Sequence, residues 1–324
     1  MPLPEFTIGI EEEYQIVDPE SRELGSYVQE LLEQGAVVLK DQIKPEMLQS
    51  QVEVGSKICH TIDEARDELI RLRRAVAKIA EDNGLRVAAA STHPFSRWSD
   101  QQVTVDDRYY KHEQAMADVA RRMLIFGMHI HIGIEDKDLM VDVMDQARYF
   151  LPHLLALSTS SPFWHGRETG MKSYRSIVFE NLPRTGPPPE FASWAEHEHY
   201  VETLIKTGCI DEPTKIWWDI RPHPRFPTLE FRVYDICTKV DEAVCMAALT
   251  LAIVAKLMKL RQEKQSWRLY QNHLVAENKC RALRYGIDGK LIDFVKHEEV
   301  PFRSLAEEMV VLVDDVLDEL DIRI

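Results

Sequence analysis

The stretch TIGIEEEYQIVDP, residues Thr7–Pro19, places three consecutive carboxylates in a segment that begins like a buried strand. Alternate side chains of a strand point to opposite faces, so Glu11 and Glu13 share a face with Thr7, whereas Glu12 lies on the other. Two neighbouring carboxylates on a sheet repel each other unless positive charge lies between them. The stretch therefore predicts a strand with a cation at its polar face and with Glu12 in a structural or edge-exposed position.

Three further segments place ionisable or polar side chains on one face at the same two-residue spacing. They are LQSQVEV (Leu48–Val54) with Gln51 and Glu53, GMHIHIGI (Gly127–Ile134) with His129 and His131, and TLEFRVYD (Thr228–Asp235) with Glu230 and Arg232. For any one segment the ordinary explanation is a solvated strand face, which antiparallel sheets commonly keep. These positions are almost all carboxylate, imidazole or guanidinium groups, however, and none is lysine. The four segments together favour one shared site.

The chemistry of these side chains indicates a hard divalent cation. Carboxylates with one or two imidazoles suit Mg²⁺ or Mn²⁺ better than structural zinc, which favours thiolates or several histidines. Mg²⁺ with few protein ligands is usually completed by water and nucleotide phosphates, and Arg232 and Arg221 would serve the same phosphate charge. The chain contains no G-x-x-x-x-G-K-[ST] or G-x-G-x-x-G phosphate loop. If ATP is used, metal ions and arginines on a sheet must hold it.

Composition narrows the class of protein. The formal net charge of −15 argues against a nucleic-acid binder, which would need a basic surface. The N-terminal segment MPLPEFTIG lacks the features of a secretory signal, and the longest apolar run, Ala243–Ala255, is shorter than the roughly 20 residues of a membrane span. The five cysteines form no Cys-x-x-Cys pair. These features predict a reduced, cytoplasmic enzyme that binds neither nucleic acid nor membrane.

The pattern along the chain predicts an α+β fold. No internal repeat or domain boundary is evident, so residues 1–324 are predicted to form one domain whose C-terminal part, from about 241, is helical. Strands alternate with helices without a phosphate-loop signature, which favours a mostly antiparallel sheet with helices on one face. Amphipathic patterns predict helices over 61–84, 106–123, 138–159, 241–263, 265–285 and 304–320. Residues 161–189 are predicted to be an irregular loop, of a length typical of functional or disordered segments.

These motifs, in their order along the chain, resemble the type 2 glutamate–cysteine ligases and, within that group, the YbdK-type carboxylate–amine ligases. The resemblance rests on GIEEE in the first strand, the strand of Glu53, THPF, RYY, GMHIHIGI, SYRS and RPHPRFPTLEFRVYD. It covers residues 7–243 in register and the helical tail more weakly. GMHIHIGI also resembles the G-M-H-x-H strand of glutamine synthetase.

The resemblance implies a fold and a reaction. It implies a glutamine-synthetase-like curved sheet with the active site in its concave face, helices on its convex face, and a single ligase domain. It implies ATP and Mg²⁺, with phosphorylation of a carboxylate that is commonly the γ-carboxylate of glutamate. An amine such as cysteine then attacks the acyl phosphate to give an amide, ADP and phosphate. A homodimer is also expected from the resemblance and from the apolar helical tail.

The resemblance also assigns metal ligands to positions of this chain. Glu11, His129 and Glu230 match the ligands of the ion nearest the γ-phosphate of ATP. Glu13 and Glu53 match the ligands of a neighbouring ion.

The resemblance also suggests a catalytic role for one arginine and substrate-binding roles for three others. Arg232, two residues after Glu230, matches the arginine that stabilises the transferring phosphoryl group. Arg175 in SYRS is suited to a substrate carboxylate, and Arg167 and Arg221 are weaker candidates for that role.

Several alternatives stay open at this point. His131 either joins the metal ligands or hydrogen-bonds a neighbouring strand, and His93, before Pro94, is a candidate for ordering a loop near the nucleotide. A phosphotransferase that stops at the phosphorylated product is a second enzyme class. A catalytically silent metal- or metabolite-binding relative is the non-enzyme alternative, although relatives freed from catalysis would be expected to lose some ligands. This chain keeps Arg232 and all five presumptive ligands, which argues against that alternative; the ligands are Glu11, Glu13, Glu53, His129 and Glu230.

Overall fold

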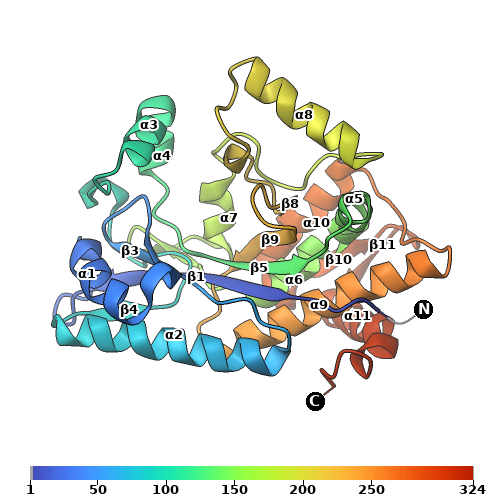
Figure 1. Ribbon diagram of the computed structural model, residues 1–324, viewed down its shortest axis with the longest axis horizontal. Coiled ribbons are helices and arrows are strands. Elements are labelled where there is room, and N and C mark those ends of the chain that lie inside the picture. The colour runs from blue at the N-terminus through green and yellow to red at the C-terminus, as the bar shows by residue number, and fades with distance from the viewer. Residues whose placement is uncertain (1–2, 324) are drawn as a thin grey trace.

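A seven-stranded antiparallel sheet, formed within residues 3–323, carries the fold (Figure 1). The computed structural model describes these residues, apart from the side chains of residues 108 and 111–113. The strands are β1 (Ile8–Val17), β2 (Ile43–Pro45), β3 (Gln51–Gly55), β4 (Arg86–Ala88), β5 (Gly127–Gly133), β8 (Ile220–Pro222) and β9 (Thr228–Asp235). Their order is β2-β3-β1-β5-β9-β8, and β4 pairs with the end of β1. The carboxylate-rich stretch at the start of the chain therefore lies near the middle of the sheet.

Helices cover one face of this sheet and surround the other. The helices are α1 (Val28–Val38), α2 (Ile62–Asp82), α3 (Asp107–Met116), α4 (Asp118–Arg121), α5 (Lys137–Ala147), α6 (Leu151–Ser158), α7 (Tyr174–Phe179), α8 (Trp194–Lys206), α9 (Val240–Gln262), α10 (Asn272–Tyr285) and α11 (Phe302–Leu317). Helix α2 packs on β1 and β4, and α9 packs on β1 and β5. Figure 1 shows α2 and α9 below the sheet and α3, α4, α7 and α8 above it. The predicted α+β fold, an antiparallel sheet with helices packed on one face, is confirmed.

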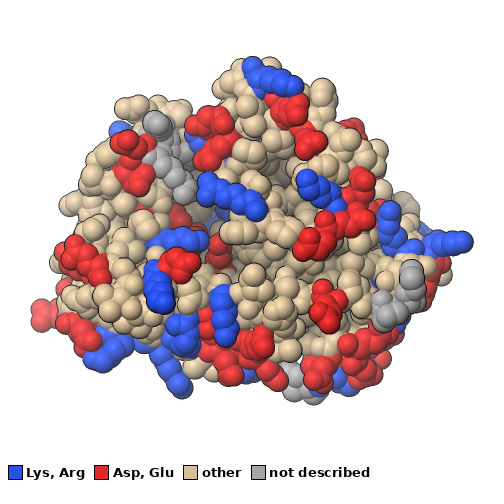
Figure 2. All heavy atoms as spheres, in the orientation of Figure 1, with Lys and Arg blue, Asp and Glu red and all other residues tan. Residues whose placement is uncertain are grey.

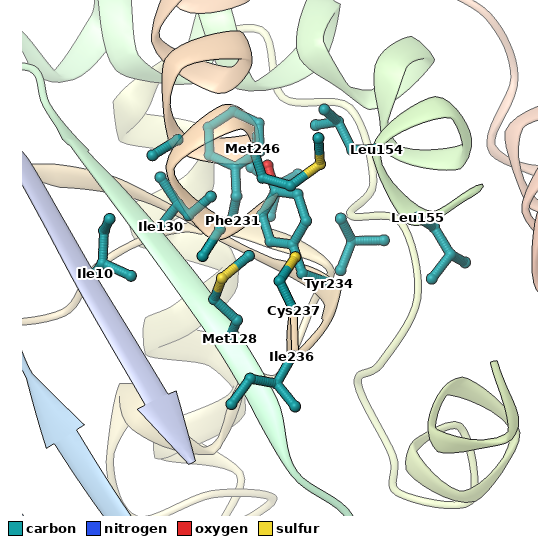
Figure 3. Close-up of a cluster of buried hydrophobic side chains, with 14 of the residues drawn as sticks. Ile10, Met128, Ile130, Leu154, Leu155, Phe231, Tyr234, Ile236, Cys237 and Met246 are labelled. Atoms are coloured by element: carbon teal, nitrogen blue, oxygen red, sulfur yellow. The ribbon is translucent and has the colours of Figure 1, made fainter. Parts of the chain in front are cut away.

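The core between the sheet and its helices depends on a bulge in β9. Phe231 and Tyr234 both lie among the buried side chains of Figure 3, although regular alternation would place residues three apart on opposite faces. Met128 of β5 is opposite Tyr234 and Ile130 is opposite Phe231, so β9 has one more residue than β5 over this interval. The bulge turns Tyr234 back into the core after Glu230 and Arg232 have pointed to the open face.

Helix α2 begins and ends where its sequence predicts. The Thr61 hydroxyl accepts a hydrogen bond from the backbone N–H of Glu64 at 3.1 Å, and the Glu64 carboxylate accepts one from the backbone N–H of His60 at 2.7 Å. Leu69, Leu72 and Val76 form its buried stripe. This capping and amphipathic pattern fixes the helix against the sheet.

Glu12 is a structural residue of the core. Its side chain is fully buried and accepts hydrogen bonds from Arg73 of α2 at 2.5 and 2.9 Å and from the Tyr14 hydroxyl. Arg73 also donates to the carbonyls of Cys237 and Thr238, just after β9. This one guanidinium therefore joins β1, α2 and the chain that leaves β9.

Several predicted boundaries were wrong because local backbone breaks interrupt the patterns. The helix predicted over 138–159 is α5 and α6 separated by a short 3-10 turn, with Pro152 in the first turn of α6. The helix predicted over 106–123 breaks at Ala117, whose φ is 48°. Helix α10 begins only at Asn272, and a hairpin, β10 (Lys290–Asp293) and β11 (Glu298–Pro301), precedes α11.

Other predicted segments contain more regular structure than the sequence suggests. Residues 161–189 include α7 and a small hairpin, β6 (Phe163–Trp164) and β7 (Arg167–Glu168), instead of one irregular loop. Strand β3 begins at Gln51, three residues later than predicted, because residues 46–50 turn the chain back from β2.

Within the described residues, α9 is the one helix long and apolar enough to cross a membrane, and 67% of its apolar window is buried inside the fold. It is the core helix that the sequence predicts.

We expect Arg73→Met to lower the free energy of unfolding by about 3–5 kcal/mol, because it leaves the buried Glu12 carboxylate without its cation. Urea unfolding at neutral pH measures this change. Lys78→Met on the same helix removes only an exposed pair with Asp82 and should leave the urea unfolding midpoint nearly unchanged. Equal effects of the two substitutions would contradict the assigned role of Arg73.

Candidate active site

Cross-strand register gathers the predicted site residues on the open face of the sheet. Glu11 is opposite His129, and Glu13 is opposite Glu53. His131 is opposite Glu230 on the next strand. Because all these strands are antiparallel, side chains of directly paired residues lie on the same face within contact distance. Figure 2 shows that the molecule is hollowed in the middle of this view, with acidic and basic side chains around the hollow.

Three groups of side chains within the described part of the chain bring ligand atoms within 4.8 Å of one another. The groups are Glu11–His131–Glu230, Glu11–Glu53–His129 and Glu13–Glu46–Glu53. His129 Nδ1 also lies 3.2 Å from a Glu11 oxygen and 3.9 Å from a Glu230 oxygen. Carboxylate oxygens and imidazole nitrogens without a thiolate are a donor set that fits Mg²⁺ or Mn²⁺.

The electrostatics of the cluster show how strongly its carboxylates interact. Burial and the charges of Glu11 and Glu46 raise the pKa of Glu53 well above its usual value. Burial opposes the ionisation of Glu11 too, but contacts with His129 and His131 outweigh it and hold its pKa well below the usual value. Lys44 Nζ lies 3.4 Å from Glu53 and 3.7 Å from Glu11. A metal cation between these carboxylates would relieve their mutual repulsion. The cluster therefore has the electrostatic character of a metal site.

Glu230 is held by two arginines. Arg221 Nε donates to it at 2.7 Å, Arg221 Nη2 donates at 3.3 Å, and Arg232 Nη1 donates to the same carboxylate. Burial disfavours its charge, but the two guanidiniums outweigh burial and hold the pKa of Glu230 well below its usual value. Arg221 also donates to the carbonyls of Thr214 and Ile216. The donors of Arg221 are thus used within the protein, and its contacts are those of a residue that positions Glu230.

Glu13 is fixed by backbone and amide donors. One of its oxygens accepts hydrogen bonds from the backbone N–H of Gly127 at 2.6 Å and from Gln51 Nε2 at 3.1 Å. Gln51 Nε2 also donates to the carbonyl of Ile125 at 2.9 Å. These contacts orient the carboxylate where β1, β3 and the start of β5 meet.

Arg175 is buried beside this point and has unused donors. Its guanidinium lies against Gly127, where a Cβ atom would come within 2.6 Å of Nη2, and it donates to the carbonyl of Arg232 at 3.4 Å. Within the described residues its Nε–H has no partner, and neither does Nε of Arg232. Both guanidiniums approach the ring of Phe179, at 5.4 and 6.0 Å. Two neighbouring arginines whose buried Nε–H groups are unused form an environment suited to an anion.

The remaining predicted residues fall in different places. Arg167 lies on the exposed hairpin β6–β7. His131 joins the cluster, with Nε2 3.5 Å from Glu11, and its Nδ1 also lies 3.2 Å from the Thr228 hydroxyl, so both proposed contacts occur. His93 accepts hydrogen bonds from the backbone N–H groups of residues 95 and 96 and pairs with the carbonyl of Arg22, so it orders its own loop.

Sequence reasoning missed two residues of the site region. Glu46 follows β2 in the turn before β3, where strand alternation gives no signal, although the hairpin brings it to Glu53. Lys279 of α10 is buried and pairs with Asp219 at 2.7 Å and with Glu180 at 2.8 Å. The carbonyl of Asp219 accepts the backbone N–H of Arg232 at 2.7 Å. A C-terminal helix therefore supports the strand that carries Arg232, a contact with no local sequence pattern.

A family model described as glutamate-cysteine ligase family 2 matches residues 7–319. The chain belongs to this family. A Herpetosiphon aurantiacus protein provisionally named glutamate–cysteine ligase 2 is 56% identical to this family member over 318 residues, which cover 98% of this chain and 83% of the relative. A Solibacter usitatus protein with the same provisional name is 51% identical over 321 residues, covering 99% of this chain and 83% of the relative.

Solved structures confirm the fold of this glutamate-cysteine ligase family 2 member. A glutamate–cysteine ligase from Francisella tularensis, solved in complex with AMP, matches with a TM-score of 0.70 at 14% identity and covers 98% of this chain and 79% of that chain. A bifunctional glutathione synthetase from Pasteurella multocida matches with a TM-score of 0.65 at 13% identity, covering 98% and 46%. The predicted family is confirmed, and with it the prediction of an ATP-dependent, C–N bond-forming ligase of glutamate–cysteine ligase type that acts on small molecules.

Two of the three predicted substrate arginines should differ in their effect on stability. Arg221→Met leaves Glu230, which is 1% exposed, with a single cation and should lower the free energy of unfolding by roughly 3 kcal/mol. Arg167→Met on the exposed hairpin should change it by less than about 0.5 kcal/mol. Urea unfolding measures both variants, and a small loss in Arg221→Met would refute the positioning role.

Proposed function

We propose that the chain uses ATP to phosphorylate the side-chain carboxylate of an amino acid, with the γ-carboxylate of glutamate as first choice, and transfers the acyl group to an amine. The observation that carries this proposal is the Glu230 carboxylate, which lies between Arg221 and Arg232 and beside the carboxylate–imidazole cluster. The two arginines, and cations bound by the cluster, would neutralise the negative charge of a transferring phosphoryl group from several sides.

The donor set supports Mg²⁺, with Mn²⁺ as an alternative. Glu11, His129 and Glu230, with His131 beside them, would hold the ion nearest the γ-phosphate. The second proposed ion would be held by Glu13, Glu46 and Glu53. Such ions, when bound, would neutralise phosphate charge during transfer.

Arg232 is proposed to donate to the transferring phosphoryl group. Its Nη1 is tied to Glu230, which fixes the plane of the guanidinium, while its buried Nε–H is unused within the described residues. A preorganised donor of this kind stabilises charge that develops in the transition state. Arg175, with its own unused Nε–H, is proposed to bind a substrate carboxylate, and Arg221 is proposed to position Glu230 instead of binding substrate.

The proposed reaction has two steps. A carboxylate oxygen of the first substrate attacks the γ-phosphorus of ATP, and ADP leaves. The amine nitrogen of the second substrate then attacks the acyl carbon, the phosphate leaves with its bonding electrons, and the nitrogen loses a proton to give the amide. Phosphorylation is needed because an unactivated carboxylate has no adequate leaving group.

Two further predictions stay proposals. Five cysteines without a disulfide support a reducing, cytoplasmic environment. Exposed apolar side chains of α11, among them Val310 and Val311, support a homodimer.

The test of the proposed function is ADP release with ATP, Mg²⁺ and glutamate across a panel of amines that includes cysteine. ADP release that depends on one amine, with a new amide detected by mass spectrometry, would establish the ligase and its acceptor. A stable phosphorylated product without an amide would establish a phosphotransferase, and no ADP despite measurable binding of Mg²⁺–ATP would refute the proposal.

Glu230→Gln should reduce amide formation by at least about 100-fold, because a neutral amide cannot replace the charge of a metal-binding carboxylate. Titration with Mn²⁺, followed by electron paramagnetic resonance, should show weaker binding to this variant. Glu135→Gln, an exposed position just after β5, is the matched control and should behave like the wild type. Normal turnover of Glu230→Gln would remove Glu230 from the site.

Arg232→Lys should also lose most activity, because a point charge cannot both hold Glu230 and donate in the plane of a guanidinium. We expect a loss of about 100-fold or more in kcat with a smaller change in the KM for glutamate. Steady-state ADP release measures both constants. A variant that changed only KM would assign Arg232 to binding instead of phosphoryl transfer.

A further inference from the structure

A cavity of about 620 Å³ lies outside the metal cluster and has no role in the steps above. Its walls come from segments far apart in the sequence and include Trp98, Arg122, Trp164, Arg167, Tyr174 and Val178. We refer to it as the aromatic–arginine cavity. Its volume lies in the range of roughly 300–1,000 Å³ that is typical of small-molecule sites.

The charges of this cavity favour an anionic group. No Asp or Glu lines it, and within the described residues neither Arg122 nor Arg167 has a carboxylate within 4.0 Å. The chain carries a net charge of −15, and several exposed arginines elsewhere, such as Arg86 and Arg323, are paired with carboxylates. Two guanidiniums without a carboxylate partner in one hollow suit a carboxylate or a phosphate.

The remaining wall is aromatic and apolar. The Arg122 guanidinium stacks on Trp98 at 5.4 Å, which orients its donors. The rings of Trp164 and Tyr174 lie 5.4 Å apart, and Val178 adds an aliphatic surface. A ligand that fits this lining carries a large apolar or aromatic group next to its negative charge.

Two chain segments connect the cavity lining to the Glu13 end of the cluster. Arg122 lies three residues before Ile125, whose carbonyl accepts the amide of Gln51 that also donates to Glu13. Tyr174 and Val178 belong to α7, the helix that places Arg175 against Gly127. Helix α7 is therefore shared by the cavity, which Tyr174 and Val178 line, and by the proposed substrate carboxylate site, to which it contributes Arg175.

We propose that the aromatic–arginine cavity binds the amine acceptor, and that this acceptor is an α-amino acid with a large apolar or aromatic side chain. The proposal rests on the proposed function and specifies its second substrate. Arg122 and Arg167 bind the carboxylate of the acceptor, and Trp98 and Trp164 contact its side chain. Its amino group then reaches the acyl phosphate beside Arg175, displaces phosphate and loses one proton. A cysteine side chain would leave most of this volume unfilled.

The test compares acceptors in the same ADP-release assay. Hydroxylamine is small, carries no carboxylate and reports formation of the acyl phosphate as a hydroxamate. L-Phenylalanine and L-leucine should exceed cysteine and glycine in kcat/KM, and phenylalaninamide, which lacks the carboxylate, should be a poorer acceptor than phenylalanine. In Arg122→Gln and in Arg167→Gln, the ratio of kcat/KM for phenylalanine to that for hydroxylamine should fall by about 10–100-fold.

One control and one further cavity variant make the outcomes distinct. Arg268→Gln removes an exposed arginine outside the cavity and should leave the ratio unchanged. Trp98→Ala should raise the KM for phenylalanine more than the KM for glycine. No hydroxamate from the wild type would refute the proposed function itself. Hydroxamate formation with a preference for cysteine or glycine, or with a KM change confined to ATP or glutamate in the Arg122 variant, would refute the acceptor site while leaving the ligase intact.

Discussion

The Glu230 carboxylate, held by Arg221 and Arg232, is the interaction on which the rest of the site depends. A sheet face with this many carboxylates is unstable unless positive charge is distributed through it. Arg221 supplies a fixed charge whose other donors are bonded to backbone carbonyls, and Arg232 shares the same carboxylate. Removal of either guanidinium leaves the buried Glu230 carboxylate with a single cation, so both arginines contribute to stability. The same principle recurs on the opposite face, where Arg73 neutralises Glu12.

The geometry of the antiparallel sheet places these charged side chains together on one face. Antiparallel pairing puts Glu11 beside His129 and His131 beside Glu230 without any loop having to be placed accurately. The bulge in β9 adds the one departure from alternation. It lets Glu230 and Arg232 remain on the open face while Tyr234 returns to the core. One short strand therefore contributes residues to both the site and the core.

The parts of this arrangement that were predictable are those encoded by a local period. Two-residue alternation and the family motifs identify Glu11, Glu13, His129 and Glu230, and helix caps identify α2. Glu46 was not predicted because it lies in a turn, where neither the strand period nor the helix period applies. The hairpin of β2 and β3 brings it close to Glu53. The contact between Lys279 and Asp219, which supports Arg232, joins residues 60 positions apart and has no sequence signal. Breaks such as the positive φ of Ala117 are set by tertiary context, which propensity does not contain.

Environment, rather than residue type, separates the arginines of this protein into different roles. Arg221 is buried with its donors bonded inside the protein, which is how a positioning residue is built. Arg175 is buried with a donor left over, a costly state that persists where a ligand completes it. Arg122 and Arg167 are exposed, have no carboxylate partner and line a cavity together with Trp98, Trp164 and Tyr174. The sequence shows four arginines of the same chemical type. Their surroundings distinguish a guanidinium whose donors are bonded within the protein from one whose donors remain for a ligand.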